Sequence, residues 1–542
     1  MNPSPAASRI SRFLFSPLGI VCLATVYLLV GLTGHDPWRG DDSRYFGPIL
    51  SILKDGAWLV PAIAGEPTLD YPPLFFWVGA LLAKLTAWLL PLHDGARLAS
   101  AAAAGATLYF LSRAATDLFG RPALAPASLL TLGTLGLVVH AHETQPILAL
   151  LACVTASWAG LARLPEAPRA GSLQAGAAAG LAGLAGGLAG LWLTLPVILL
   201  CLAAPPQEQS GPARRGLAFG LVATALILAA WLLPLIYLEP ALAGRWWRQE
   251  WSNWGYLETP GRLLEQLGWF LWPLWPIAGW ALWKHRRQLT RFPWRLVLTG
   301  TILALAQVML NNDVPRPPEL LPLIPPLALL AAAGVPSLRR GAANAFDWFA
   351  VMTFLVFALL VATAWSAMAL AWPPGLARQL IKLAPGFRLE VSWTMAALAA
   401  TLLAGWMILV WRTPRSPNRG PINWATGMTM LWCMAVALLM PWFDHGKSFR
   451  PAAQSLAKAL RNGPTGCIAG QNLPSGLRAS MDYFADLRIE PLKDGGSSCT
   501  MLLVSVDRRT PLPQRFQQAS AVWEYRRGGG RQLEILRLYR RS

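Results

Sequence analysis

The chain has 542 residues, of which 54% are hydrophobic and only 13% are charged, and its formal net charge is +19 at pH 7. A charged share of about half the usual value excludes an ordinary soluble domain. Many apolar runs reach about 18 residues, which is enough to cross about 30 Å of hydrocarbon. The positive charge is spread between these runs, which argues against a nucleic-acid-binding protein and fits basic cytoplasmic loops. We therefore expect a polytopic helical membrane protein.

The first apolar run covers residues 13–34. It is too long for the hydrophobic core of a signal peptide, and no small-residue cleavage site follows it. Arg9 and Arg12 precede the run, which favours a cytoplasmic N-terminus because cytoplasmic flanks are enriched in basic residues. We expect an uncleaved first span that starts on the cytoplasmic side.

The following apolar runs cannot each be one span, because that count places arginine-containing loops outside the cytoplasm. These runs lie at 73–91, 98–118, 122–140, 147–162 and 173–203. Two changes restore the charge rule. The run at 73–91, which begins at a pair of prolines, then lies at the outer interface without crossing. The run at 173–203 then forms two short helices that break near Gly186 and Gly187.

The remaining apolar runs alternate regularly with basic loops that we assign to the cytoplasm. The runs lie near 216–238, 266–284, 296–312, 319–335, 347–371, 392–411 and 423–442. The basic loops are 205–216, 284–291, 336–343 and 411–420. The complete count is about 13 spans, and an odd number with a cytoplasmic N-terminus places the C-terminal tail outside.

Two domains follow from this count. Residues 1–443 form the transmembrane domain, in which residues 35–97 are the first extracytoplasmic loop. Residues 444–542 alternate helical and strand-like patterns and predict a small extracytoplasmic α/β domain. Cys467 and Cys499 lie in this tail and are candidates for a disulfide, since such bonds persist outside the cytoplasm.

Two adjacent acids, Asp41 and Asp42, follow the first span directly. In the simplest interpretation they are solvated loop acids. In the functional interpretation a carboxylate at the membrane surface acts on a lipid head group, because ionisable residues at this depth are costly and mark functional sites. The composition of the loop alone leaves both interpretations open.

The rest of this loop carries a series of short motifs in a fixed order. It contains DDSRY at 41–45, DGAWLVP at 55–61, GEP at 65–67 and DYPPL at 70–74. This series resembles the first large loop of GT-C type polyprenyl-phosphate-dependent glycosyltransferases, more narrowly the superfamily of aminoarabinose (4-amino-4-deoxy-L-arabinose) lipid A transferases and protein mannosyltransferases. Two later segments are also similar to family segments, so the resemblance covers most of the chain: RPPELLPLIPPLALLAAAGV (316–335) and MPWFDHGKSFRPAAQSLAKAL (440–460).

The resemblance implies 13 spans, interface helices in the first loop and an extracytoplasmic α/β domain. It also implies an inner-membrane enzyme that moves a sugar, aminoarabinose or a related amino sugar, from an undecaprenyl phosphate carrier at the outer face of the membrane. The implied acceptor is a lipid A phosphate or another envelope group. In the mannosyl branch the acceptor is a protein hydroxyl group. The C-terminal domain would then be periplasmic.

The motifs assign roles on the acceptor side of the reaction. Asp41 takes the position of the family's leading aspartate and is the candidate general base or orienting group, with Asp42 as the alternative. The family has an aspartate where this chain has Gln145, and glutamine cannot act as a base. His142 and Glu143 lie close to Gln145 in the sequence and are candidates to replace it on the acceptor side.

The motifs also assign roles on the donor side. Asp70 and Arg44 are candidate substrate or phosphate contacts, although a structural pair of Arg44 with Asp41 or Asp70 is at least equally compatible with the motif. Tyr71 stands where the family often has a lysine that contacts the carrier phosphate. A guanidinium binds phosphate well, so later-loop arginines are expected to replace that lysine. Arg316 and Arg262 are favoured among the candidates, which also include Arg245 and Arg248.

The sequence leaves the metal, the sugar and the acceptor open. The only histidine and acid cluster, around His142, lacks the spacing of a zinc site, and a divalent ion remains compatible with the family. Transfer of another hexose and protein O-mannosylation are alternatives. A transporter of lipid-linked sugars would show paired repeats, which the sequence lacks. A non-catalytic homologue is a further alternative, because Tyr71 and Gln145 depart from the family pattern.

Overall fold

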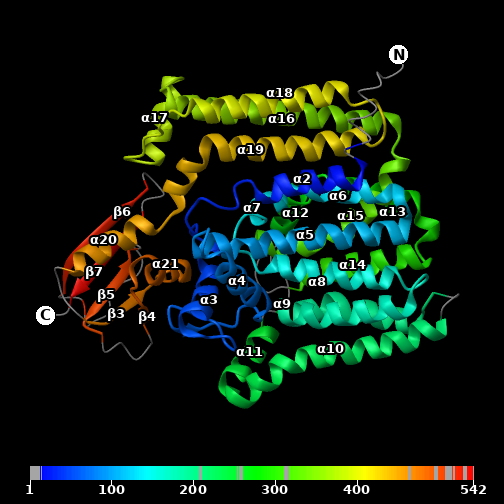
Figure 1. Cartoon of the computed structure of the whole chain (residues 1–542), viewed down its shortest axis with the longest axis horizontal. Helices are drawn as coiled ribbons and strands as arrows, with labels where there is room; N and C mark the ends of the chain where they lie inside the picture. Colours follow the sequence, from blue (N-terminus) through cyan, green and yellow to red (C-terminus); the bar gives the residue numbers. More distant parts are fainter. Residues whose placement is uncertain are drawn as a thin grey trace.

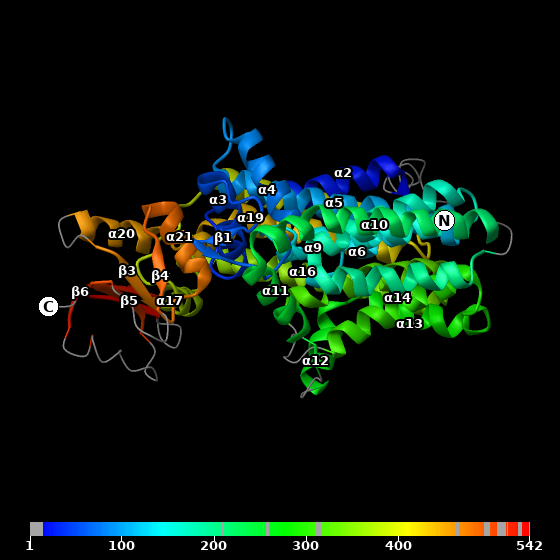
Figure 2. The same cartoon turned by 90° about the horizontal axis from the view of Figure 1, so that it is seen from below.

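The computed structural model describes residues 13, 15–206, 210–252, 254–255, 260–310, 316–461, 466–492, 499–506, 516, 519–528 and 534–540. Most of the described residues are helical, and the long helices run side by side (Figure 1). Shorter helices and a sheet gather at one end of this bundle. Figure 2, turned by 90°, shows the same division between the bundle and the sheet-bearing unit.

The bundle confirms a multi-pass helical membrane protein. Within the described residues, seven helices are long and apolar enough to cross a membrane by length and composition. The bundle helices are α2 (Pro17–Leu29), α5 (Leu92–Phe119), α6 (Leu124–Leu132), α7 (Leu135–His140), α8 (Ile147–Ala162), α9 (Pro168–Ala203), α10 (Ser210–Leu238), α13 (Leu274–Lys284), α14 (Phe292–Met309), α15 (Ile324–Gly334), α16 (Arg340–Ala369), α18 (Trp393–Arg412) and α19 (Arg419–Lys447). Short 3-10 turns η1 (Arg121–Ala123), η3 (Arg286–Gln288), η4 (Pro317–Leu323) and η5 (Val335–Ser337) join some of them.

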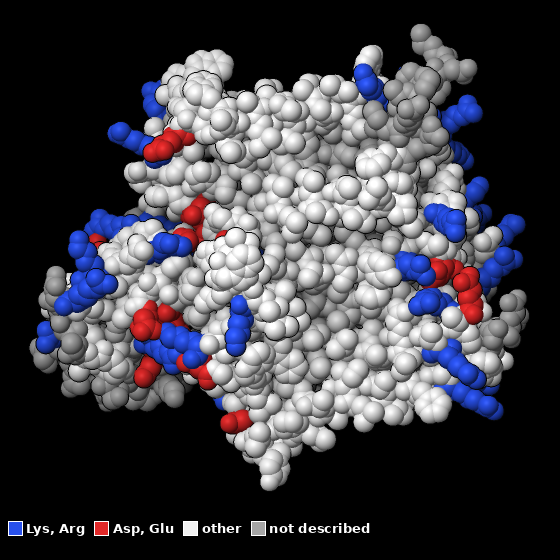
Figure 3. Space-filling view, viewed as in Figure 1, with Lys and Arg blue, Asp and Glu red and all other residues white. Residues whose placement is uncertain are grey.

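The middle of the bundle surface is nearly free of charge. Figure 3 shows Lys and Arg at the two ends of the helices and almost none between them. Large apolar side chains such as Phe219, Leu226 and Leu359 are more than half exposed. An uncharged band with exposed apolar side chains is the surface that hydrocarbon requires, because the bilayer core cannot solvate charge.

Helix α9 is two helices that fold back on each other. Gly186 and Gly187 have non-helical backbone angles, with φ of −145° and +57°. A Cβ atom on Gly190 would lie 2.1 Å from a backbone carbonyl oxygen of the preceding half of α9, so the two halves are in close contact. The run at 173–203 therefore breaks at its glycines, as the sequence predicts. The Leu188 N–H after the break donates to the Glu250 carboxylate at 2.9 Å.

Five shorter helices lie beside the bundle: α3 (Asp41–Asp55), α4 (Leu74–Thr86), α11 (Pro240–Ser252), α12 (Pro260–Phe270) and α17 (Pro374–Leu383). With 13 residues, α4 is about 20 Å long, which is less than the thickness of the hydrocarbon core. It packs against α3 and α5. The placement of residues 73–91 at the interface remains a prediction, because α2, the expected first span, also has 13 residues.

Helix α3 places the acidic motif at the end of the bundle. It begins after Gly40, whose φ of 103° is open to glycine but strained for other residues, and it ends at the left-handed Gly56. Asp41 and Asp42 occupy its first turn, where the positive end of the helix dipole stabilises carboxylates. Ten of its 15 residues are buried, so its orientation is set by packing on several sides.

The C-terminal unit is a small α/β fold. Its elements are α20 (Arg450–Arg461), β3 (Ile468–Gln471), α21 (Ser475–Ala485), β4 (Ile489–Pro491), β5 (Met501–Ser505), β6 (Ser520–Arg527) and β7 (Glu534–Arg540). The strand order is β4-β3-β5-β7-β6, in which β3 pairs in parallel with β4 and β5 and the other pairs are antiparallel. Helix α19 continues past the predicted boundary at residue 444 and ends at Lys447.

One feature stabilises this unit internally, and another attaches it to the first loop. Cys467 and Cys499 form a disulfide, the pairing that the sequence proposed. Helix α21 packs against α3, where a Cβ on Gly47 would lie 3.0 Å from the Cβ of Ala479. The first loop and the C-terminal unit therefore form one packed end of the molecule. The first loop also contains the short hairpin β1 (Ala62–Ile63) and β2 (Glu66–Pro67).

Candidate active site

Asp41 lies where three separate segments meet. Its Oδ1 is 3.6 Å from Nη1 of Arg316, which precedes η4. Its Oδ2 accepts a hydrogen bond of 3.3 Å from Nε2 of Gln145, which lies just before α8. The structure thus brings together three residues that are far apart in the sequence and that the motifs singled out. The Asp41 side chain is 22% exposed, so a substrate can reach it.

Arg316 holds two carboxylates at once. Its Nε donates to Oε1 of Glu319 at 2.8 Å, and its backbone N–H donates to Oε2 of the same residue at 3.1 Å. Glu319 and Asp41 together neutralise the guanidinium, which remains 46% exposed. A half-exposed ion pair is weak. A phosphate can therefore replace one of these carboxylates on Arg316 without a large loss of stability.

A second ion pair lies beside the first. Nη2 of Arg44 donates to Oδ2 of Asp70 at 2.5 Å, which realises the structural pairing that the sequence left open. Gln249 of α11 approaches Oδ1 of Asp70 at 3.5 Å. Among the described residues, Nε of Arg44 has no hydrogen-bond partner although it is buried. Arg44 thus keeps a donor for a ligand while its charge is held by Asp70.

Two tyrosines form the wall between these ion pairs. The rings of Tyr45 and Tyr71 meet edge to face with centroids 5.4 Å apart. Burial raises the pKa of Tyr45 to about 12, and burial also raises the pKa of Tyr71. Both hydroxyls therefore stay protonated at neutral pH and can donate to an anion. Tyr71 can replace the family lysine only as a hydrogen-bond donor, because it carries no charge.

Asp42 differs from Asp41 in its exposure and in its hydrogen-bond partners. It is 1% exposed and bound by Arg97 through two contacts of 3.3 and 2.9 Å. The N–H groups of Trp38 and Thr144 also donate to it. Burial alone would raise the pKa of Asp42, but the Arg97 guanidinium and these hydrogen bonds hold it well below its usual range. Because all its oxygens are engaged, we assign Asp42 to positioning of the loop.

His142 does not face Asp41. Its Nδ1 lies 2.6 Å from the carbonyl oxygen of Val138, its Nε2 lies 2.6 Å from that of Tyr27, and its ring stacks on Trp432. Both nitrogens are occupied in the bundle core. This geometry therefore gives no support to a role of His142 on the acceptor side. Residues that are neighbours in a turn can point in different directions, and His142 points into the core while Gln145 points toward Asp41.

Glu143 faces a different group of residues from Asp41. Its carboxylate lies 3.8 Å from His140 and 3.9 Å from Lys447 at the end of α19. Gln145, in contrast, is fully buried, and its side-chain amide donates to Asp41. Its Oε1 has no hydrogen-bond partner among the described residues. Of the three candidates in this turn, only Gln145 contacts Asp41 in the described structure.

The structure does not assign the other three candidate arginines to the site around Asp41. Arg245 and Arg248 lie on the exposed face of α11, and the side chain of Arg262 is outside the described part of the structure. Within the described residues, no group of three His, Cys, Asp or Glu side chains could hold a metal ion. Of the arginines that the motifs singled out, Arg44 and Arg316 are the two that the described structure places near Asp41.

Sequence reasoning missed the residue that organises the loop, Arg97. It is fully buried, and it donates to Asp42, to Oδ1 of Asp94 at 2.7 Å and to the carbonyl oxygens of His35 and Asp36 at 2.9 and 2.7 Å. The sequence signal was an isolated arginine in the run GARLASAAAA. A charge at such a place is expected to be paired and to have a specific role.

Buried His35 gives this loop a pH dependence. Burial, with a further contribution from the Arg97 charge, lowers the pKa of His35 from 6.5 to about 4. The unfolded chain therefore binds one more proton than the native chain between pH 6.5 and pH 4, so the free energy of unfolding falls as the pH is lowered through this window. We expect a loss on the order of 3 kcal/mol, which would be detected as a fall in the melting temperature of the detergent-solubilised protein as the pH is lowered.

The matched variants are His35→Gln, which should reduce this slope, and His285→Gln, which should leave it unchanged. His285 stacks on Trp294 at the other end of the bundle. Equal slopes in the wild type and in His35→Gln would contradict the assignment.

The described architecture is a membrane-protein fold that is shared with a solved structure. The chain shares its fold with ArnT from Cupriavidus metallidurans. Compared with that structure bound to undecaprenyl phosphate, the TM-score is 0.69 at 17% identity, over 96% of this chain and 97% of that chain. The apo structure gives 0.65 at 16% identity over the same shares. The resemblance inferred from the loop motifs is thus confirmed at the level of the fold.

Sequence comparison reaches a smaller part of the chain. The undecaprenyl phosphate-alpha-4-amino-4-deoxy-L-arabinose arabinosyl transferase 1 of Pseudomonas fluorescens (strain Pf0-1) is 25% identical over 242 residues, which are 44% of this chain and 41% of that protein. The corresponding transferase 2 of Sodalis glossinidius (strain morsitans) is 28% identical over 64 residues, 12% of each chain. The chain therefore matches less than half the length of these curated relatives. No protein-family model matches it.

Proposed function

We propose that this chain is a glycosyltransferase that moves a sugar from a polyprenyl phosphate carrier to an acceptor in the cell envelope. The sugar is aminoarabinose or a related amino sugar, and the acceptor is a lipid of the lipid A type. The observation that carries this proposal is the meeting of Asp41, Arg316 and the Arg44–Asp70 pair at one end of an apolar helix bundle. The fold shared with ArnT supports the reaction class.

The chemistry needs a carboxylate and a cation on opposite sides of one carbon atom. An acceptor oxygen attacks the anomeric carbon of the sugar, the bond from that carbon to the carrier phosphate breaks, and the phosphate leaves with the electron pair. Arg316 and Arg44 stabilise the phosphate as its charge grows. Asp41 orients the acceptor, or removes its proton where the acceptor is a hydroxyl group. An acceptor that is already anionic needs the orienting role alone.

The carboxylates around the arginines suit an amino sugar. Asp70 and Glu319 neutralise Arg44 and Arg316 before a donor arrives. When a carrier phosphate takes over these guanidinium groups, the carboxylates lose their partners. A cationic amino group on the sugar would then pair with them. This exchange favours an amino sugar over a neutral hexose.

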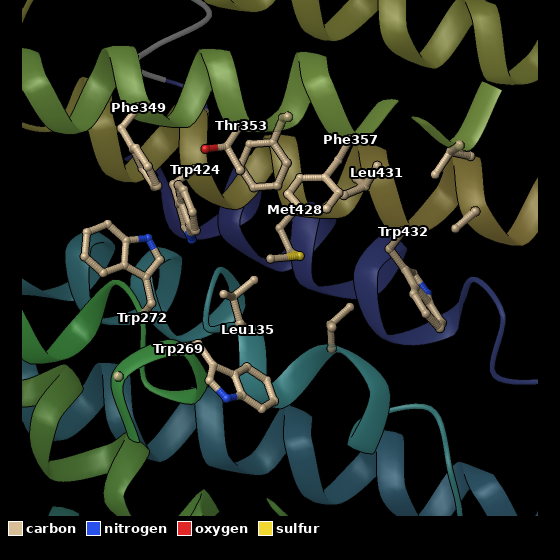
Figure 4. A pocket seen from close by; sticks show the side chains of 15 residues that line it. Leu135, Trp269, Trp272, Phe349, Thr353, Phe357, Trp424, Met428, Leu431 and Trp432 are labelled. Atoms are coloured by element: carbon tan, nitrogen blue, oxygen red, sulfur yellow. The ribbon is translucent and has the colours of Figure 1, made fainter. Parts of the chain in front are cut away.

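An apolar pocket of about 730 Å³ offers space for the polyprenyl tail. Figure 4 shows Trp269, Trp272, Phe357 and Trp432 around it, on helices α12, α16 and α19 and the segment after α12. Helices α7 and α12 line this pocket and also contact η4, which begins directly after Arg316. A carrier with its tail in the pocket would have its phosphate within reach of this arginine.

The disulfide supports a periplasmic location of the C-terminal unit. Cys467 and Cys499 would be kept reduced in a cytoplasm, whereas a periplasm preserves such a bond. The site lies beside this unit, because α3 packs on α21. The reaction is therefore assigned to the outer face of the cell membrane, with the N-terminus in the cytoplasm.

Mass spectrometry of membrane lipids tests the proposal directly. Lipids from cells with and without the gene are compared, and a sugar-sized mass difference on lipid A phosphate supports it. An unchanged lipid A profile together with altered glycoproteins would assign the enzyme to the protein branch. Unchanged lipids and unchanged glycoproteins would contradict transferase activity.

Arg316 provides a prediction about carrier binding. We expect Arg316→Ala to weaken the binding of undecaprenyl phosphate to the purified protein about tenfold to a hundredfold, because one charge-assisted contact to the phosphate is lost. Titration of the detergent-solubilised protein with undecaprenyl phosphate measures this change. Arg378→Ala is the matched control, since Arg378 is an exposed arginine on α17 with no ion pair among the described residues. Equal affinities of the wild type and Arg316→Ala would exclude Arg316 from the phosphate site.

A further inference from the structure

A second group of cations lies beside Asp41, at the junction of the first loop with the C-terminal unit. Residues 38–39 pair with residues 447–448: Trp38 and Ser448 form a β-bridge, and the Arg39 N–H donates to the Lys447 carbonyl oxygen at 2.9 Å. Arg39 is exposed and lies two residues before Asp41. The junction therefore places two cationic side chains directly next to the first turn of α3.

Arg527 at the end of β6 joins this group from the C-terminal unit. It donates to the carbonyl oxygen of Gly446, and its guanidinium lies 5.1 Å from the ring centroid of Phe449. Its Nη1 is buried and has no hydrogen-bond partner among the described residues. Burial and the nearby Arg39 charge lower the pKa of Arg527, which places the two arginines within electrostatic reach of each other.

The charge balance of this group differs from that of the arginines near Arg316. In the described structure, Arg44, Arg97 and Arg316 each have a carboxylate within 4 Å. Arg39 and Arg527 have no such ion pair among the described residues, although Glu534 acts on Arg527 at longer range. Lys447 has one distant partner, Glu143 at 3.9 Å, and lies 4.2 Å over the Trp38 ring.

Like charges that are held together with only distant carboxylates repel each other, and an anion would relieve that repulsion. A phosphate group matches this arrangement best, because two guanidinium groups and an ammonium group offer several donors to its three outer oxygens. Figure 3 shows Lys and Arg gathered at this end of the molecule, where the C-terminal unit meets the bundle.

We propose that Arg39, Lys447 and Arg527 form a phosphate-binding site for the acceptor lipid, separate from the arginines that receive the carrier phosphate. This inference rests on the proposed function and names how its acceptor is held. Arg39 lies two residues before Asp41, and all three cations lie on different segments from Arg316. The acceptor and the carrier thus approach Asp41 with their phosphates on two different groups of cations.

The test compares the binding of two lipids by the full-length protein in detergent. We expect the double variant Arg39→Gln/Arg527→Gln to bind lipid A at least about tenfold more weakly than the wild type, with undecaprenyl phosphate binding unchanged. Arg526→Gln is the matched control, because Arg526 is the neighbouring strand residue, 65% exposed and paired with Glu524. The single variant Arg39→Gln alters an exposed side chain only, and it keeps the test valid if the double variant unfolds.

Three other results are informative. Equal lipid A affinity in the wild type and in both variants would overturn the site. Inorganic phosphate binding as tightly as lipid A, with the same loss in the variants, would identify a site for free phosphate and would overturn the acceptor assignment. A wild type that binds lipid A through these residues but does not bind undecaprenyl phosphate would support the site and contradict the proposed carrier.

Discussion

The Asp41→Asn variant is expected to lose sugar transfer by about a hundredfold or more, while it still folds and still binds undecaprenyl phosphate. Asparagine keeps the shape of the side chain, but it carries no negative charge. It can therefore neither orient the acceptor as a carboxylate does nor remove a proton from a hydroxyl acceptor. It also removes a negative charge 3.6 Å from Arg316. The carrier phosphate should therefore bind as tightly as in the wild type or more tightly. Lipid mass spectrometry measures transfer, and titration with undecaprenyl phosphate measures binding.

The control for this experiment lies on the same helix. Asp55 is at the opposite end of α3 and pairs with Arg488 of the C-terminal unit at 2.5 Å. Asp55→Asn removes one carboxylate from α3 without touching the site, so it should leave transfer unchanged. Full transfer by Asp41→Asn would show that this carboxylate has no chemical role. Loss of transfer together with loss of carrier binding would instead indicate a general collapse of the loop.

Local sequence chemistry predicted the features of this fold that depend on a few neighbouring residues. Gly186 and Gly187 broke an apolar run that was too long for one span, and the structure turns back there. Cys467 and Cys499 lie in the polar tail, which the sequence predicts to be outside the cytoplasm, and they form a disulfide. The motif order in the first loop predicted a fold that the chain shares with ArnT from Cupriavidus metallidurans.

Properties that depend on contacts between distant segments could not be predicted in the same way. The sequence did not show that His142 turns into the core, because a polar turn does not specify which side chain points inward. It also did not distinguish Asp41 from Asp42. That distinction comes from Arg97, 55 residues away from Asp42, which binds the Asp42 carboxylate and leaves that of Asp41 partly exposed. The motifs place both Asp41 and Asp42 at the start of the loop. The hydrogen-bond partners of each carboxylate then decide which of the two a substrate can contact.

Arg97 should therefore be the most sensitive position outside the substrate contacts. Arg97→Met would leave Asp42 and Asp94 buried without their shared partner, and breaking a buried pair in this way lowers the free energy of unfolding by about 3–5 kcal/mol. Arg97→Lys keeps a positive charge, but a single ammonium group cannot serve two carboxylates and two carbonyl oxygens together. We expect an intermediate loss for this variant. Thermal unfolding of the detergent-solubilised protein measures both changes.

A half-exposed arginine in the same network provides the comparison. Arg450 binds the buried Asp36, but the Arg450 side chain is 43% exposed. Arg450→Met should therefore lower the free energy of unfolding by less than Arg97→Met, by about 1–2 kcal/mol. If Arg97→Met were no more harmful than Arg450→Met, the buried network would not organise the loop. Arg97 also fixes the residue next to Asp41. Transfer per folded molecule should therefore fall in Arg97→Met and recover in part in Arg97→Lys, because a purely structural role would lower only the amount of folded protein.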